Sequence, residues 1–406
     1  MRRASVVALA CAGLVAPGVT GAGGPLTFDA DGEPYTWPLG TTIQYRTDGG
    51  RLSALVSQDA ARARVAAMFQ VWDDVASAAL SYSRQGTIPN VGAFTDGDVS
   101  TAAEYNAVEG ACNNGAMSPI VFDEDGTLFE DLGQDSAVIG FAGPCAINAS
   151  DQFVSGQAVM NGIYRDGIDN ASNPEIGDTL FDAAFVHEFG HFSGLDHSQI
   201  NVECGFSSCS LIDLDGLPTM FPFLVSDTQR TLSIDDVAWF SRLYPAGGAG
   251  GFAATHGTIT GTVYFSDGES HLQYANVIAR RAEAGGSEPR WLAVSSVSGY
   301  RFRACTPNGI TNPAPDFCPP SGSLNPTHIG LYEIPVPPGS YTIEVEPIDP
   351  AFIDGSSVGP SDRPIAMPGA APAPLGPITI SAGQTSGGHD IVLIGTPPRF
   401  DQFEGS

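Results

Sequence analysis

Residues 187–197 read His-Glu-Phe-Gly-His-Phe-Ser-Gly-Leu-Asp-His, and this segment constrains the chain more than any other. If the segment begins as a helix, His187 and His191 lie four positions apart and share one face. Gly194 can adopt the left-handed backbone that ends a helix and turns the chain back. That turn would bring His197 to the same point as the first two imidazoles. The spacing therefore predicts three histidine ligands around one zinc ion.

A carboxylate stands beside the first of these histidines. Glu188 follows His187 directly and could act as a base. Zinc with three protein ligands keeps a fourth position for water, which is the arrangement of catalytic sites. Two alternatives stay open: a helix that buries structural histidines, and a structural zinc without chemistry. The catalytic interpretation is favoured, because structural zinc sites usually fill the fourth position with Cys or His.

The segment resembles the zinc-binding motif of the metzincin metalloproteases at all five fixed positions of that motif. Members of this family also place a methionine in a tight turn beneath the metal. Residues 217–222, Leu-Pro-Thr-Met-Phe-Pro, resemble that Met-turn, with Met220 located 23 residues after His197. The alternative is that Met220 is an ordinary core side chain.

Further details resemble the matrixin branch of the metzincins. Ser198 follows the third histidine, and Pro222 stands where other branches carry a metal-binding Tyr. Residues 232–236, Leu-Ser-Ile-Asp-Asp, resemble the matrixin third helix, whose Asp pair braces the Met-turn and the N-terminus. Asp235 and Asp236 could instead be the capped and solvated start of an ordinary helix.

Residues 1–22 are typical of a secretory signal peptide. Arg2 and Arg3 precede an apolar run from Ala4 to about Val15, and small residues follow up to Ala22. No other stretch is apolar and long enough to span a bilayer. We therefore expect a secreted, extracellular protein without membrane insertion.

The cysteines support the same compartment. Loss of the signal peptide would remove Cys11 and leave six of the seven Cys, and an even number in an exported protein suggests disulfides. Sequential pairing is one of the fifteen arrangements that six Cys allow. We favour it because each pair lies within one expected structural region. The pairs are Cys112 with Cys145, Cys204 with Cys209, and Cys305 with Cys318.

The formal net charge of the chain is −28. Such acidity argues against nucleic acid or an anionic membrane as a partner. One acidic turn follows an apolar strand signal at residues 119–122 and reads Asp-Glu-Asp-Gly. Asp123 and Asp125 could bind calcium there, and a plain turn is the alternative.

The predicted zinc domain covers residues 23–246. The resemblance implies an α+β fold, with a twisted mixed sheet and long helices. Ile139, Gly140, Phe141 and Ala142 resemble the metzincin edge strand, along which a substrate peptide lies antiparallel. An ordinary strand is the alternative for these four residues.

A second domain follows a Gly-rich linker at residues 247–254. Short strand signals separated by turns predict an all-β sandwich over residues 255–396, before a tail at 397–406. Its segment 330–345 resembles the carboxypeptidase regulatory-like, transthyretin-like domain. The linker predicts a limited interface, so a chain ending near Gly248 would keep its activity on short peptides.

The resemblance implies a secreted zinc endopeptidase that acts on a protein or peptide substrate. Glu188 would be the general base of the reaction. Two alternatives remain: a catalytically inactive zinc-containing surface binding protein, and a zinc amidase that acts on a non-protein amide. The intact Glu188 favours an enzyme. The sequence does not indicate the natural substrate or the oligomeric state.

Overall fold

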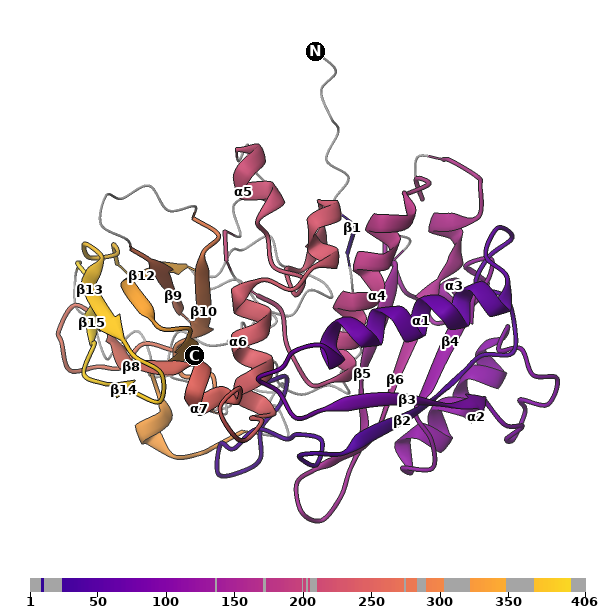
Figure 1. The fold of residues 1–406 in the computed structure, drawn as a ribbon, viewed down its shortest axis with the longest axis horizontal. Coiled ribbons are helices and arrows are strands. Elements are labelled where there is room, and N and C mark those ends of the chain that lie inside the picture. The colour runs from indigo at the N-terminus through magenta and orange to yellow at the C-terminus, as the bar shows by residue number, and fades with distance from the viewer. Residues whose placement is uncertain are drawn as a thin grey trace, which may run out of the picture.

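A computed structural model describes most of the chain. The described residues are 24–135, 137–170, 173–198, 200–201, 204, 210–273, 275–282, 290–302, 322–347 and 369–395, together with the backbone of 9–10. Within them the chain has mixed sheets and seven α-helices, as the α+β prediction requires. Figure 1 shows the helix-rich N-terminal part beside a C-terminal part built mostly of strands.

The N-terminal part contains strands and helices in alternation. Its strands are β1 (Leu9–Ala10), β2 (Thr42–Thr47), β3 (Ser81–Thr87), β4 (Pro119–Asp123), β5 (Gly140–Ile147), β6 (Phe153–Asn161) and β7 (Phe223–Leu224). Its α-helices are α1 (Gln58–Asp73), α2 (Ala102–Asn113), α3 (Thr127–Asp131), α4 (Asp178–Phe192), α5 (Leu211–Asp215) and α6 (Ile234–Leu243). Two short 3-10 helices are η1 (Gly162–Arg165) and η3 (Asp227–Arg230).

Five strands form one sheet in the order β3-β2-β4-β6-β5. The first four run parallel, and β5 is an antiparallel edge strand. The central strand β4 is buried on both faces, because Ile120 and Phe122 join one apolar cluster while Val121 joins another. Helices α1 and α4 cover the first face and α2 covers the second (Figure 1).

Helices α1 and α4 pack against each other through aromatic rings. Phe69 stacks on Phe189 with ring centroids 3.7 Å apart. Trp72 Nε1 donates a hydrogen bond of 2.8 Å to the carbonyl of Val186 in the middle of α4. The apolar face of α1 is thus core, and it fixes α4 between α1 and the sheet.

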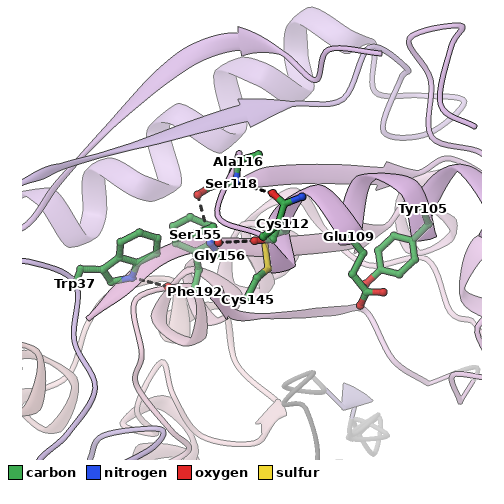
Figure 2. Close-up of a disulfide and its surroundings, with 11 residues drawn as sticks. Trp37, Tyr105, Glu109, Cys112, Ala116, Ser118, Cys145, Ser155, Gly156 and Phe192 are labelled. Atoms are coloured by element: carbon green, nitrogen blue, oxygen red, sulfur yellow. Dashed lines mark hydrogen bonds between the residues drawn. A yellow bond between two sulfur atoms is a disulfide. The ribbon is translucent and has the colours of Figure 1, made fainter. Parts of the chain in front are cut away.

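A disulfide joins the edge strand β5 to helix α2, which covers the second face of the sheet. Cys112 of α2 is bonded to Cys145 of β5 (Figure 2). Beside it, Ser155 Oγ donates to the carbonyl of Cys112 at 2.6 Å. Sequential pairing is therefore confirmed for this pair. Cys204 also takes part in a disulfide, whereas Cys209, Cys305 and Cys318 lie outside the described residues.

The acidic turn after β4 serves as a structural cap. The carboxylate of Asp123 accepts hydrogen bonds from the amides of Gly126 and Phe129, and Asp125 accepts one from Thr127. Among the described residues, no group of three potential metal ligands includes either Asp. The carboxylate oxygens are thus used by amides of the turn itself, and calcium binding at Asp123 and Asp125 stays a prediction.

The C-terminal part contains two sheets. Its elements are α7 (Phe252–Thr255), β8 (Gly257–Tyr264), β9 (Ala275–Arg281), β10 (Ala293–Val297), η4 (Pro326–His328), β11 (Leu331–Val336), β12 (Gly339–Pro347), β13 (Leu375–Ile380), β14 (Thr385–Ser386) and β15 (Ile391–Val392). One sheet has the order β10-β9-β12-β13, and the other has the order β11-β8-β14 with β15 also paired to β8. Both sheets contribute to one buried apolar cluster.

The interface between the two parts is larger than the Gly-rich linker predicts. Helix α6 lies against β10 (Figure 1) and also contacts β11. The rings of Phe28 and Trp239 contact Tyr300, with centroids 5.5 Å and 6.1 Å apart. The same apolar cluster runs through both parts. The expectation of a limited interface was therefore wrong, because buried apolar residues on both sides of the linker pack together.

Among the described residues, no helix has the length and apolar character needed to cross a membrane.

Candidate metal centre

Three imidazoles converge at the C-terminal end of α4. Nε2 of His191 lies 3.0 Å from Nε2 of His187 and 3.1 Å from Nε2 of His197. Two nitrogens bound to one tetrahedral zinc at about 2.0–2.1 Å would be roughly 3.4 Å apart, so the spacing suits such an ion. The three side chains are 1 % exposed or less. In the described part of the chain, they are the only group of this kind.

The end of α4 is what brings the third histidine into place. Gly194 has a φ of +88°, and its amide donates to the carbonyl of His191. The next amide, that of Leu195, donates to the carbonyl of Gly190. These two bonds form a Schellman motif, which reverses the chain after a helix. The turn predicted at Gly194 is confirmed.

Backbone carbonyls orient the first two imidazoles. Nδ1 of His187 lies 2.7 Å from the carbonyl of Thr219, and Nδ1 of His191 lies 2.8 Å from that of Leu195. A carbonyl accepts only, so each Nδ1 carries the proton and each Nε2 keeps its lone pair for a metal. Such partners fix both the tautomer and the plane of a ligand.

The segment around His197 is held from two sides. The amide of Asp196 donates to the carbonyl of Gly24, and the amide of Leu26 donates to that of Gly194. The amide of Ser198 donates to the carbonyl of Met220 at 2.7 Å. The residues before and after His197 are thus fixed by the chain's N-terminal segment and by the turn at Met220.

Burial keeps the first two histidines neutral. Desolvation, helped by the neighbouring His197, lowers the pKa of His187 to about 3. Desolvation, helped by the neighbouring His197 and His187, also lowers the pKa of His191 well below its usual value. Both rings therefore stay deprotonated at Nε2 far below pH 6.5. A zinc ion would meet two ligands that do not need to lose a proton.

The lowered pKa values of His187 and His191 predict an unusual pH dependence for zinc binding. Protons compete with a metal only below the pKa of the ligand. Three ordinary imidazoles with a pKa near 6.5 would weaken zinc binding roughly 1000-fold between pH 7.5 and 5.5. We expect a loss of about tenfold or less, because His187 and His191 take up no proton in this interval. Competition with a chelator at both pH values measures it, and a 1000-fold loss would contradict the assignment.

Met220 occupies the turn that the sequence predicts for it. The amide of Phe221 donates to the carbonyl of Pro218 and closes the turn. Met220 is 2 % exposed and packs against α4 at Gly190. A Cβ on Gly190 would lie 2.2 Å from the Met220 sulfur. The glycine between the first two ligands thus makes room for Met220 beside the metal centre.

Asp236 stabilises the turn at Met220. Its carboxylate accepts hydrogen bonds from the amides of Thr219 at 2.9 Å and Met220 at 3.0 Å. It also closes a capping box with Ser233 at the start of α6. Asp236 therefore both braces the turn at Met220 and caps helix α6. The alternative of a solvated helix start is wrong for Asp236, because this residue is 2 % exposed.

Asp235 has a different partner from the one that the resemblance implies. Its Oδ1 accepts a hydrogen bond of 2.8 Å from the amide of Ser295 on β10. It also has a hydrogen bond with the side chain of Ser198. Burial, with Asp236 beside it, raises the pKa of Asp235 to about 7. The C-terminal sheets therefore contact Asp235, where the resemblance implies the N-terminus as the partner.

Glu188 is fully buried and lies against the start of the edge strand. A Cβ on Gly140 would be 2.9 Å from Cγ of Glu188. Of the predicted edge-strand residues, Gly140, Phe141 and Ala142 lie in β5, and Ile139 precedes it. The edge strand therefore begins beside Glu188, which directly follows His187 in the sequence.

Sequence reasoning missed the residues that act through their backbone or through having no side chain. Thr219 and Leu195 contribute carbonyls, which no residue type marks. Gly190 was visible as a glycine inside a predicted helix, where it costs stability relative to alanine. That cost was the one available signal that another group approaches α4 at this position.

Comparison with protein-family models gives no match, and comparison with curated proteins gives no relative. The assignment of the site therefore depends on its own geometry: a buried group of three histidines that is able to hold a metal ion.

Proposed function

We propose that the protein is a secreted zinc endopeptidase of the metzincin type, similar to the matrixins. The observation that carries the proposal is the combination of three convergent imidazoles with Glu188 beside them. The Schellman turn at Gly194, the turn at Met220 and the bracing by Asp236 agree with that family. The two C-terminal sheets are consistent with a sandwich domain of the carboxypeptidase regulatory-like class.

The side chains divide the chemistry between them. His187, His191 and His197 would hold the zinc, which when bound lowers the pKa of a water and polarises the scissile carbonyl. Glu188 accepts the proton of the attacking water and returns it to the leaving nitrogen. Burial strengthens both functions, since charges interact more strongly where water is excluded.

Two strand edges near the site suit an extended peptide. One edge of β5 is paired with β6, and β5 ends the sheet on its other side. On the side of the Met-turn, β7 pairs antiparallel with the extended backbone of β1, with Leu9 opposite Leu224. Strand β1 lies within the predicted signal peptide, residues 1–22, so its removal would leave this edge of β7 open to a substrate. Backbone hydrogen bonds to such edges bind a peptide regardless of its sequence. These edges favour a polypeptide over a non-protein amide as substrate.

A peptide library tests this function directly. The purified protein should cleave library peptides, lose the activity in a strong chelator and regain it when zinc is added. Cleavage that persists without metal would contradict the zinc mechanism. Zinc binding without cleavage of any peptide would favour a binding protein, and hydrolysis restricted to non-peptide amides would favour an amidase.

Gly140→Ala should lower peptide cleavage by about 10- to 100-fold with zinc retained, because small displacements of catalytic groups have such effects. The new methyl group would press on Cγ of Glu188, whereas the metal ligands are untouched. Gly110→Ala is the matched control, since a Cβ there meets no atom within 4 Å. Equal kcat values for the two variants would show that β5 does not approach Glu188 as described.

A further inference from the structure

The C-terminal sheets contact the loop that follows the third histidine. Ile200 is fully buried and forms an apolar cluster with Ile278 of β9 and Ala293 of β10. Asn201 is 1 % exposed and has a φ of +55°. The loop thus reaches the C-terminal sheets within four residues of His197.

Arg280 of β9 is the polar anchor of this contact. Its side chain is 8 % exposed, and its Nη1 donates to Oδ1 of Asn201 at 3.0 Å. Glu344 and Glu346 on β12 bind the same guanidinium at 2.8 Å and 3.3 Å. The two carboxylates, with the carbonyl of Arg290 that accepts from Nη1 at 2.6 Å, hold the arginine in one orientation. The other N–H group of Nη1 is then directed at Asn201.

A second contact joins the sheets to the residue directly after His197. Strand β10 is an edge strand, and α6 covers its open side at Ser295. The amide of Ser295 donates to Asp235, and its carbonyl accepts from Trp239 Nε1, each at 2.8 Å. Asp235 in turn bonds the side chain of Ser198. A path of hydrogen bonds therefore leads from β10 to the neighbour of His197.

We propose that the C-terminal sheets form part of the metal centre: Arg280 and Asp235 are positioning residues that hold Asn201 and Ser198, so that His197 completes the metal site. The proposal depends on zinc binding by the three histidines and not on peptide cleavage. It follows that contacts on β9 and β10 set the zinc affinity of a site in the other part of the chain.

Zinc affinity of the full-length protein tests the proposal. Asn201→Gly removes the side chain that Arg280 holds, and glycine accepts the positive φ without strain. Arg280→Met removes the donors and keeps most of the aliphatic stem. We expect each variant to bind zinc about 10-fold more weakly in competition with a chelator, as changes to outer partners of ligands commonly do. The visible spectrum of the cobalt-substituted protein should change as well, because it reports the ligands of the metal.

Two controls make the result decisive. Arg290→Met removes the same charge from a half-exposed side chain that lies 3.9 Å from the same Glu346. It keeps the backbone carbonyl that accepts from Arg280 and leaves the contact between Arg280 and Asn201 intact, so it should bind zinc within about twofold of the parent. The two substitutions break the same contact, that between Arg280 and Asn201. The double variant Asn201→Gly, Arg280→Met should therefore lose no more zinc affinity than whichever single variant binds zinc more weakly. If Arg280→Met does not fold, Asn201→Gly alone decides. Parental affinity and an unchanged cobalt spectrum in a folded Asn201→Gly variant would overturn the proposal, and so would losses that multiply in the double variant.

Discussion

Glu188→Gln should lower peptide cleavage by about 100- to 10,000-fold and leave one zinc bound per chain. The amide has nearly the shape of the carboxylate but cannot accept the proton of the attacking water. The zinc should stay, because the three imidazoles and the carbonyls behind them are unchanged. Metal analysis and the rate of cleavage of one short peptide measure the two effects on the same preparation.

His197→Ala is the comparison variant. It should lose both the zinc and the activity. If Glu188→Gln cleaves at the parental rate, another group is the base. If it loses the zinc as His197→Ala does, Glu188 supports the metal site and the proposed division between ligands and base is wrong.

A chain that ends at Gly248 should fail to form an active metal centre. It would lack Ser295, the partner of both Asp235 and Trp239, and would expose the apolar surface around Phe28. Each lost hydrogen bond costs about 1–3 kcal/mol when its buried partner is left unsatisfied. Domains have only about 5–15 kcal/mol of stability in total. We therefore expect no measurable cleavage of even a short peptide, and no cooperative unfolding transition.

The control for this truncation is a chain that ends at Gly395, which retains every C-terminal strand that the structure describes. It should match the full chain in zinc content and activity. A truncated protein ending at Gly248 that folds, binds zinc and cleaves the short peptide within about tenfold of the full chain would show that the two parts are independent after all.

The local features of the site could be predicted from the sequence because they depend on spacing within one segment. The distance of four residues between His187 and His191 and the helix end at Gly194 follow from helix geometry alone. Met220 was identified through the resemblance of residues 217–222 to a Met-turn, 23 residues after His197. The disulfide between Cys112 and Cys145 was predicted by pairing cysteines that are neighbours in the sequence. That spacing did not reveal that the bond joins α2 to the edge strand.

The contacts between the two parts could not be predicted in the same way. Ser295 acts through its backbone amide and carbonyl, so its residue type carries no signal. Arg280 would have the same sequence pattern in an exposed strand. The Gly-rich linker suggested independence, but a flexible connection does not limit how much buried surface the connected parts share. The acidic turn at Asp123 matched calcium chemistry by residue type, yet its oxygens are used by backbone amides.

The most direct test of the zinc peptidase assignment is a titration of the metal-free, full-length protein with zinc while cleavage of one short peptide is followed. We predict that the rate rises in proportion to added zinc and stops rising at one zinc per chain, with no activity before the first addition. Activity that is present without zinc, or that stays absent at every ratio while zinc is bound, would contradict the assignment.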